Sequence, residues 1–266
     1  MMYSYRIVAI GDIHVELNLL NLAFEWISKN SIDAVIQTGD ICNARLLPKD
    51  ANLAQILNQA DSTFDIFKSS NKLINFVPGN HDPIEIGSKY VSDTIINRHS
   101  NSGYLFNYKI TGIGGSHSVP SQLIGKTVPF IESSLDHIYD LADLDYVGKR
   151  IIDDFEYYIH SDIIKNYDYL FPCDILITHT PALIEGADYH NYASLGIYKL
   201  IERYQPLLHI SGHIHLPKTH IEKIEWENKK ATTLINLGSL DEKKIFLIEL
   251  SKNEIKVDEV SVIELE

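Results

Sequence analysis

Cysteines and long apolar runs are both scarce in this chain of 266 residues. Its two cysteines, Cys42 and Cys173, provide no disulfide framework, which is typical of a protein in the reducing cytosol. The apolar runs are all far shorter than the ~20 residues that a membrane-spanning helix needs. The chain also enters a strand-like run at Tyr5, which leaves no room for a signal peptide. We therefore expect a cytoplasmic protein without a membrane segment.

Positive charge is scarce as well. The chain has 23 lysines and arginines against 36 aspartates and glutamates, a formal net charge of -13. General repulsion disfavours indiscriminate binding of nucleic acids, although a local basic groove would overturn this, and a small anionic substrate stays compatible. Hydrophobic residues make up 45% and charged residues 22%, as in ordinary globular proteins, and the length suits one large core. We expect a single domain over residues 1–266.

Several short polar patches are present, and each directly follows an apolar run. Such runs, ended by glycine or a turn residue, are typical of buried strands. The patches are Gly11-Asp12-Ile13-His14, Gly39-Asp40, Gly79-Asn80-His81-Asp82, His179 and Gly212-His213-Ile214-His215. Each patch is thus predicted to lie in the loop after a strand, where open α/β sheets bind their ligands.

The order of the predicted elements favours an α/β fold. The first half alternates strands and helices, which predicts a parallel sheet with right-handed crossovers. Its predicted elements are strands 5–10, 34–38 and 72–77 and helices 16–29 and 51–67. Residues from about 85 to 171 are less regular and are expected to border the site as a partly helical insert. Within that region we predict a strand at 104–111 and a helix at about 144–165.

The C-terminal part of the chain is predicted to be mainly β. Strands are expected at 175–178 and 207–211, with a helix at 193–204 between them. Four strand-like segments near 219–225, 232–236, 244–250 and 255–263 then end the chain. This succession favours antiparallel hairpins over further crossovers.

The residue types of the patches indicate a metal centre. Any one patch is more simply a solvated turn, as Asp188-Tyr189-His190 illustrates, but the joint occurrence of all the patches favours a site. Asp12 and His14 are two residues apart, so in an extended loop they point the same way and can hold one ion. The two oxygens of Asp40 can bridge two ions. Oxygen and imidazole ligands are typical of Mn, Fe or Zn sites. Two divalent ions beside two aspartates leave a net positive charge, which suits a negatively charged phosphate ester.

The set of motifs, in this order along nearly the whole chain, resembles that of the calcineurin-like metallophosphoesterase superfamily. The resemblance implies a four-layer α-β-β-α sandwich of two mixed sheets with flanking helices. It also implies one metal ion held by Asp12, His14, Asp40 and His215, and another held by Asp40, Asn80, His179 and His213. His81 would assist the leaving group without binding metal, and Asp82 would orient it. A hydroxide bridging the two ions would attack phosphorus in line.

Two further segments, Ile113-Gly114-Gly115-Ser116 and Ile235-Asn236-Leu237-Gly238-Ser239, resemble elements of small prokaryotic and archaeal phosphoesterases related to cyclic-nucleotide phosphodiesterases. His117 follows the first segment and is a candidate substrate contact, although a simple loop histidine is as good an interpretation. His209 is predicted to be a core or supporting histidine, and Cys42 to pack beneath the site.

These features predict an enzyme that hydrolyses a small phosphate ester with two divalent metal ions, manganese being one candidate. A phosphodiester is the first choice of substrate and a phosphomonoester the second, while a nuclease is disfavoured by the net charge. The alternative from another class is a non-catalytic interaction module on the same fold. Such a module needs neither a complete ligand set nor His81, and both are present.

Overall fold

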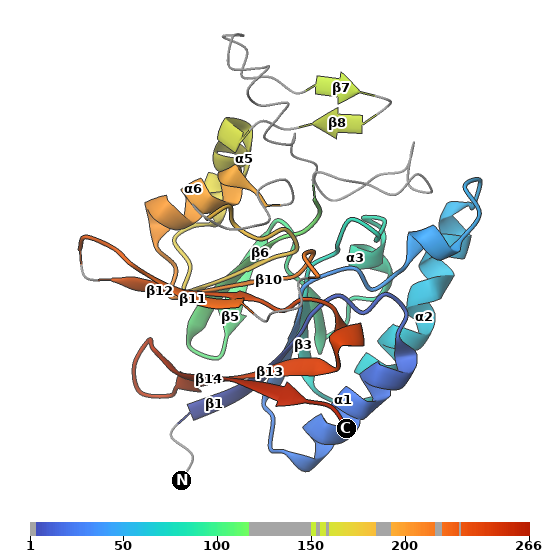
Figure 1. The fold of residues 1–266 in the computed structure, drawn as a ribbon, viewed down its shortest axis with the longest axis horizontal. Coiled ribbons are helices and arrows are strands. Elements are labelled where there is room, and N and C mark those ends of the chain that lie inside the picture. The colour runs from blue at the N-terminus through green and yellow to red at the C-terminus, as the bar shows by residue number, and fades with distance from the viewer. Residues whose placement is uncertain are drawn as a thin grey trace.

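Two six-stranded mixed sheets form the centre of the molecule in a computed structural model (Figure 1). The structure describes residues 4–116, 150–152, 155–157, 160–184, 193–215, 220–228 and 230–266. The first sheet contains β1 (Ser4–Ile10), β2 (Ala34–Gln37), β3 (Leu73–Phe76), β4 (Ile95–Asn97), β13 (Lys244–Ser251) and β14 (Val257–Glu264). The second contains β5 (Asn101–Leu105), β6 (Tyr108–Ile113), β9 (Ile175–Thr178), β10 (Leu208–Ser211), β11 (His220–Glu225) and β12 (Ala231–Asn236).

The strand order brings distant segments together. In the first sheet it is β14-β13-β1-β2-β3-β4, and in the second it is β11-β12-β10-β9-β6-β5. β1, β2, β3 and β4 are mutually parallel, as the alternation of strands and helices predicted. The second sheet has its own parallel group, which consists of β6, β9, β10 and β12.

Three hydrophobic clusters separate four layers. Because successive side chains of a strand point to opposite faces, each central strand contributes to two clusters. In β1, Ile7 and Ala9 point between the sheets, whereas Val8 and Ile10 point toward helices α1 (Leu17–Lys29) and α2 (Leu53–Ser69). In the second sheet, Ile175 and Ile177 of β9 face the first sheet, while Leu176 packs with helix α6 (Leu195–Tyr204). The predicted four-layer α-β-β-α sandwich is therefore confirmed.

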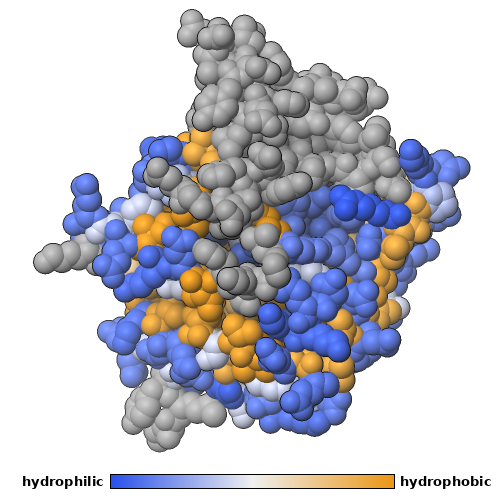
Figure 2. Space-filling view, viewed as in Figure 1, coloured by the Kyte–Doolittle hydropathy of each residue, from blue (hydrophilic) through white to orange (hydrophobic). Residues whose placement is uncertain are grey.

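The outer helices begin at residues suited to that position. Asn52 and Gln55 form a capping box at the start of α2, and the side chain of Ser194 accepts the backbone N–H of Ile197 at the start of α6. Across the described residues, no helix has the length and apolar character needed to cross a membrane. On the face shown in Figure 2, hydrophilic residues are interspersed with smaller groups of hydrophobic ones.

The region expected to be an irregular insert is partly built into the sheets. After the short helix α3 (Ile86–Lys89), β4 extends the first sheet, and β5 and β6 form a hairpin at the edge of the second. The predicted strand at 104–111 therefore corresponds to parts of both β5 and β6. Residues 117–149 of this region lie outside the described residues, so a bordering insert stays a prediction there.

The helix predicted over about 144–165 is wrong over residues 150–152 and 155–157, where the structure describes strands. Residues 150–157 contain the antiparallel strands β7 (Arg150–Ile152) and β8 (Phe155–Tyr157), and α5 (His160–Tyr167) begins only after them. Isoleucine, phenylalanine and tyrosine favour strands, so local preference prevailed over the helical spacing of the apolar positions. A short 3-10 helix (Asp168–Leu170) follows α5.

The predicted C-terminal hairpins are present, but they lie in different sheets. β11 pairs antiparallel with β12, and β13 pairs antiparallel with β14. β12, however, also lies parallel to β10, so one further crossover exists that was not expected. The chain then crosses to the first sheet, where β13 lies antiparallel to β1. Hairpin turns are local features, whereas the sheet that a hairpin joins depends on distant packing.

Candidate metal centre

The loops after the parallel strands of both sheets meet at one edge of the sandwich (Figure 1). Backbone hydrogen bonds join these loops, both from one sheet to the other and within the second sheet. The N–H of Asp12, after β1, donates to the carbonyl of Gly238, after β12, over 3.1 Å. The N–H of Gly212, after β10, donates to the carbonyl of His179, after β9, over 3.0 Å. The carboxyl ends of the strands thus place all the predicted patches side by side.

Two glycines of the motifs are required by close approach. A Cβ atom on Gly79 would lie 2.1 Å from Oδ1 of Asp40, and one on Gly212 would lie 2.3 Å from Oδ1 of Asp12. Contacts this short do not occur between real atoms, so any side chain there would push a carboxylate out of the site. Glycine next to the polar residues therefore lets the neighbouring loops and their side chains touch.

Three of the predicted ligands have left-handed backbone conformations. The φ angles are 47° at His14, 50° at Asp40 and 68° at His213. Non-glycine residues rarely adopt positive φ, and those that do concentrate at functional sites, where the surrounding fold offsets the cost. The fold thus maintains strained backbone at residues whose side chains point into the candidate site.

Asp12 lies fully buried between the loops of the second sheet. Its Oδ2 is 2.9 Å from Nε2 of His215, and its Oδ1 is 3.8 Å from Nδ1 of His179. The backbone N–H of His213 also points at this carboxylate, at 3.0 Å from Oδ2. One aspartate thus contacts residues from two different loops.

Asp40 occupies the middle of the site. Its Oδ2 faces His14, 3.6 Å from Nε2, and its Oδ1 faces His179, 3.5 Å from Nε2. The N–H of His81 donates to Oδ1 over 2.7 Å. The two carboxylate oxygens therefore point toward different histidines, which is the arrangement that a carboxylate bridging two ions requires.

His179 and Asn80 form a pair that a cation would satisfy. Nδ1 of His179 contacts the carbonyl oxygen of Thr38 at 2.8 Å, and Nε2 contacts Oδ1 of Asn80, also at 2.8 Å. A carbonyl only accepts hydrogen bonds, so Nδ1 carries a proton. In the neutral ring, Nε2 and the Asn80 oxygen would then be two acceptors facing each other, an arrangement that a proton or a metal ion near both would satisfy.

The pKa of His179 also indicates that its surroundings favour a positive charge. Burial by itself would lower it, but the carboxylates of Asp40 and Asp12 outweigh burial and raise the pKa to about 9. In the metal-free protein a proton therefore takes the place that the geometry offers to a cation.

The donor atoms fit a two-metal site. Three groups of side chains place their donor atoms within 4.8 Å of one another: Asp12, His14 and His215; His14, Asp40 and His81; and Asp40, His179 and His213. Among the described residues, no lysine or arginine forms an ion pair with buried Asp12 or Asp40. Carboxylates, imidazoles and an amide oxygen are together the ligands of Mn, Fe and Zn. The structure brings together all the predicted ligands: Asp12, His14, Asp40, Asn80, His179, His213 and His215.

His81 lies within the same cluster, next to His14, with ring centroids 4.8 Å apart. Its Nδ1 is buried and has no hydrogen-bond partner in the described part of the chain. Burial lowers the pKa of His81 to about 4, although the Asp40 carboxylate opposes this. The low pKa keeps the ring neutral at pH 7.

Asp82 does not contact the His81 ring as predicted. Its carboxylate accepts three backbone N–H groups, from Ile41 at 3.1 Å, Cys42 at 2.8 Å and Gly79 at 2.8 Å. Asp82 therefore joins the loop after β2 to the loop after β3. An aspartate one residue from the histidine in sequence points elsewhere because adjacent side chains of a tight loop diverge.

Ser116 was named in the sequence only as part of a glycine-rich segment. Its hydroxyl lies 2.8 Å from Nε2 of His213, so the loop after β6 contacts a predicted metal ligand. Arg45 was not singled out at all, yet it lines a pocket that contains His14, His81 and His215. The sequence gives no signal for Arg45, because it does not directly follow an apolar run as the predicted ligands do.

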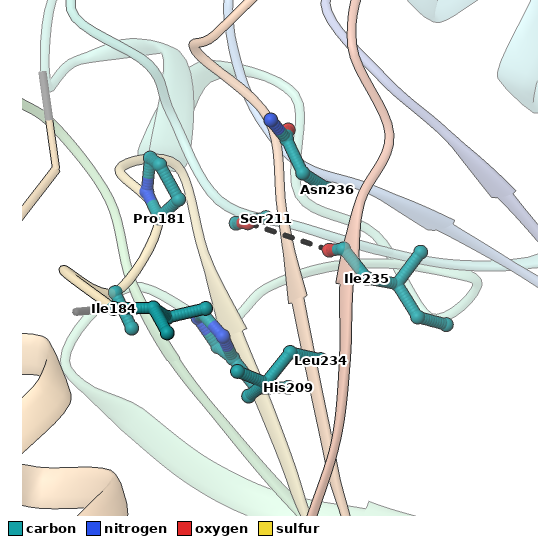
Figure 3. Close-up of a pocket in the computed structure, with 8 residues that line it drawn as sticks. Pro181, Ile184, His209, Ser211, Leu234, Ile235 and Asn236 are labelled. Atoms are coloured by element: carbon teal, nitrogen blue, oxygen red, sulfur yellow. Dashed lines mark hydrogen bonds between the residues drawn. The ribbon is translucent and has the colours of Figure 1, made fainter. Parts of the chain in front are cut away.

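The remaining candidates are supporting residues or lie outside the described chain. His209 is buried, its Nε2 is 2.8 Å from Oγ1 of Thr178, and burial lowers its pKa to about 3. It lines a cavity of about 10 Å³ (Figure 3), room for about one water molecule. Cys42 is buried, with its thiol toward the carbonyl of Ile56 at 3.4 Å, as expected for packing beneath the site. His117 lies outside the described residues.

Comparisons with known proteins agree with this centre. The sequence model of the family called calcineurin-like phosphoesterase matches residues 5–217. No curated protein sequence matches the chain. The fold is similar to that of the protein TT1561 of Thermus thermophilus, with a TM-score of 0.63 and 14% identity, covering 99% of this chain and 100% of that one.

Two solved phosphatases share the fold. A dimetal phosphatase from Danio rerio has a TM-score of 0.51 and 11% identity, covering 98% of this chain and 99% of that one. A phosphatase from Mycoplasma pneumoniae has a TM-score of 0.51 and 13% identity, covering 99% of this chain and 94% of that one. The family match spans most of the chain and includes every residue of the predicted ligand set, so the chain belongs to the calcineurin-like phosphoesterase family.

Proposed function

We propose that the protein hydrolyses a small phosphodiester with two divalent metal ions. The observation that carries this proposal is Asp40, whose two oxygens point toward His14 on one side and His179 on the other. When bound, the two ions would activate a water molecule and draw charge from the phosphate oxygens. Under this proposal Asp12, His14, Asp40 and His215 hold one ion, and Asp40, Asn80, His179 and His213 hold the other.

The chain's own residues would then position the substrate. His81 lies beside His14 and lines the adjoining pocket, so it is suited to contact the ester. We assign His81 to a position beside the leaving oxygen, which lies opposite the attacking water across phosphorus. Because its pKa is about 4 in the free protein, His81 can act as an acid only once the negative phosphate raises that pKa.

Replacing His81 with alanine separates this role from metal binding. His81→Ala should keep both metal ions and most of the thermal stability, while turnover falls by ~10²–10⁴-fold. The loss should be larger for alkyl esters, whose leaving group needs a proton, than for nitrophenyl esters, which do not. Metal content by elemental analysis and rates with both ester types measure this.

Two results would change the assignment. Equal losses for both leaving groups would make His81 a stabiliser of charge on the phosphoryl oxygens and not an acid. Because His14, Asp40 and His81 also lie within 4.8 Å of one another, a loss of metal in His81→Ala would instead make it a ligand.

A phosphomonoester is the second candidate substrate. The solved relatives with a TM-score of 0.51 are named as phosphatases, one of them dimetal, which supports a two-metal hydrolase without choosing between ester types. Assays of the protein loaded in turn with Mn, Fe or Zn, each with a nitrophenyl monoester and a bis-nitrophenyl diester, decide this. A preference for the diester is expected.

A non-catalytic module on the same fold is the alternative from another class. The complete set of ligands and the presence of His81 favour an enzyme. Protein purified without chelator that contains no metal and hydrolyses neither ester with any added metal would support the module.

We also propose a cytoplasmic location. The unpaired buried thiols of Cys42 and Cys173 support it.

A further inference from the structure

A pocket of about 300 Å³ opens beside the candidate metal centre. His14, His81 and His215 line its inner side, and Arg45, Leu46 and Asp241 are among the residues that line the rest. A pocket of this size is at the lower end of the range for small-molecule sites and exceeds what a phosphate group alone fills. The proposed function uses the inner histidines and leaves the other lining residues without a role.

Arg45 is the one lysine or arginine among the lining residues in the part of the chain that the structure describes. It lies in a short 3-10 helix (Ala44–Leu46) in the loop that begins at Asp40. Its side chain is exposed, and it forms no ion pair with a described aspartate or glutamate. The planar guanidinium, with several N–H donors, is therefore available to bind a carboxylate or phosphate.

Arg45 and His81 line the same pocket. The proposed function places the leaving group beside His81. A leaving group that extends from His81 into this pocket therefore enters the space that Arg45 lines.

Leu46 adds an apolar surface next to this cation. It is 69% exposed, which is unusual for a leucine that lines a polar pocket. A group with both a carbon framework and a negative charge could contact Leu46 and Arg45 together.

We infer that Arg45 determines specificity by binding an anionic group, a carboxylate or a phosphate, on the leaving part of the substrate. This inference rests on the proposed function, because it takes His81 as the residue beside the leaving oxygen. It narrows the substrate class to phosphate esters whose leaving group carries a second negative charge.

Two matched diesters test it. Methyl phosphodiesters of 4-hydroxybenzoate and of 4-hydroxybenzamide have leaving groups of similar shape, of which only the first carries a charge. The wild-type protein should prefer the benzoate ester in kcat/KM. Arg45→Gln should reduce the ratio of the two kcat/KM values about fivefold, the upper limit for an exposed ion pair. The wild-type preference should also decline as salt is raised, because salt screens exposed charges.

Lys49→Gln is the matched control. Lys49 is exposed, belongs to the same loop and does not line the pocket, so its loss changes the net charge equally without removing the proposed contact. The ratio should stay at the wild-type value in Lys49→Gln. Arg45→Lys, which keeps the charge but loses the planar donor pair, should give an intermediate ratio.

The outcomes separate this inference from the proposed function. Hydrolysis of neither ester by metal-loaded wild-type protein would overturn the proposed function. If the protein hydrolyses both esters and Arg45→Gln leaves the ratio of their kcat/KM values unchanged, the role of Arg45 is overturned while the proposed function stands. An equal fall of the ratio in Lys49→Gln would show a general effect of net charge and would also overturn it.

Discussion

Asp40 stays ionised although it is buried. Burial by itself would raise its pKa, but the nearby rings of His179, His81 and His14 hold the pKa well below its usual range. A carboxylate that keeps its charge without a lysine or arginine is a strong ligand for a cation. The residue therefore combines charge, burial and contacts on two sides in a single side chain.

Replacing Asp40 with asparagine should remove charge from both proposed ion positions at once. We expect Asp40→Asn to lose at least one metal equivalent per chain and nearly all turnover. Elemental analysis and rates with the preferred ester measure this. Asp241→Asn makes the same chemical change at a residue of the adjoining pocket and should keep both ions. An Asp40→Asn variant with two ions and normal rates would exclude the bridging role.

At the scale of the elements, the site depends on loops held against each other. Asp82, in the loop after β3, accepts the N–H groups of Ile41 and Cys42 in the loop after β2, and also that of Gly79 in its own loop. Burial and the charge of Asp40 raise the pKa of Asp82 to about 6, so it is an acceptor at neutral pH. Since both loops contain proposed ligands, this connection sets the distance between Asp40 and Asn80.

Asp82→Asn should therefore loosen the site and not alter the acid–base chemistry. The amide has only one acceptor oxygen, so at least one of the three buried N–H groups would lose its partner, at a cost of ~1–3 kcal/mol. The melting temperature should fall by about 3–10 °C and metal affinity should fall with it. Calorimetry and metal titration measure both effects.

The leaving-group dependence distinguishes this role from the one predicted from the sequence. If Asp82 orients the His81 ring, Asp82→Asn should reproduce the selective loss with alkyl esters seen in His81→Ala. If it joins the loops, rates with alkyl and nitrophenyl esters should fall by the same factor. An unchanged melting temperature would exclude the structural role.

The elements also show where local patterns succeed. The helices α1, α2 and α6 and the strands β1, β2 and β3 lie within a few residues of their predicted bounds. Each helix has a clear apolar period, each strand is a short apolar run, and a turn or cap lies at their ends. β7 and β8 were missed, because strands of three residues are too short to show a period of two.

For the whole molecule, metal binding should be coupled to stability and to pH. The site consists of buried polar groups from both sheets, so it exists only in the folded chain. Ions that bind there must therefore raise the stability of the folded chain by mass action. We expect chelation to lower the melting temperature by several degrees, on the scale of ~1 kcal/mol or more. An unchanged melting curve after verified metal removal would count against a two-metal site.

The pH dependence has a defined sign. The pKa of His179 rises from its ordinary value of 6.5 to about 9 in the fold, so its charged form stabilises the metal-free protein below pH 6.5. That stabilisation is lost as the pH rises through about 9, whereas metal binding needs the deprotonated ring. The gap in melting temperature between loaded and chelated protein should widen from pH 6.5 to 9. A constant gap over this range would contradict the competition between proton and metal at His179.

The α/β class, the main helices and strands and a metal centre at the strand ends could be predicted from the residues, because apolar runs, helical periods, glycines and polar residues after strands are short-range patterns and a parallel sheet brings strand ends to one edge. The family and the full set of proposed metal ligands came from the resemblance of the motifs, in their order along the chain, to those of a known family.

Contacts between segments distant in sequence could not be predicted and are known from the structure. These include the three N–H groups that Asp82 accepts, the hydroxyl of Ser116 beside His213, the parallel pairing of β12 with β10 and the place of Arg45 in the pocket. Each depends on how two loops or sheets pack, and no spacing along one segment encodes the position of another segment beside it.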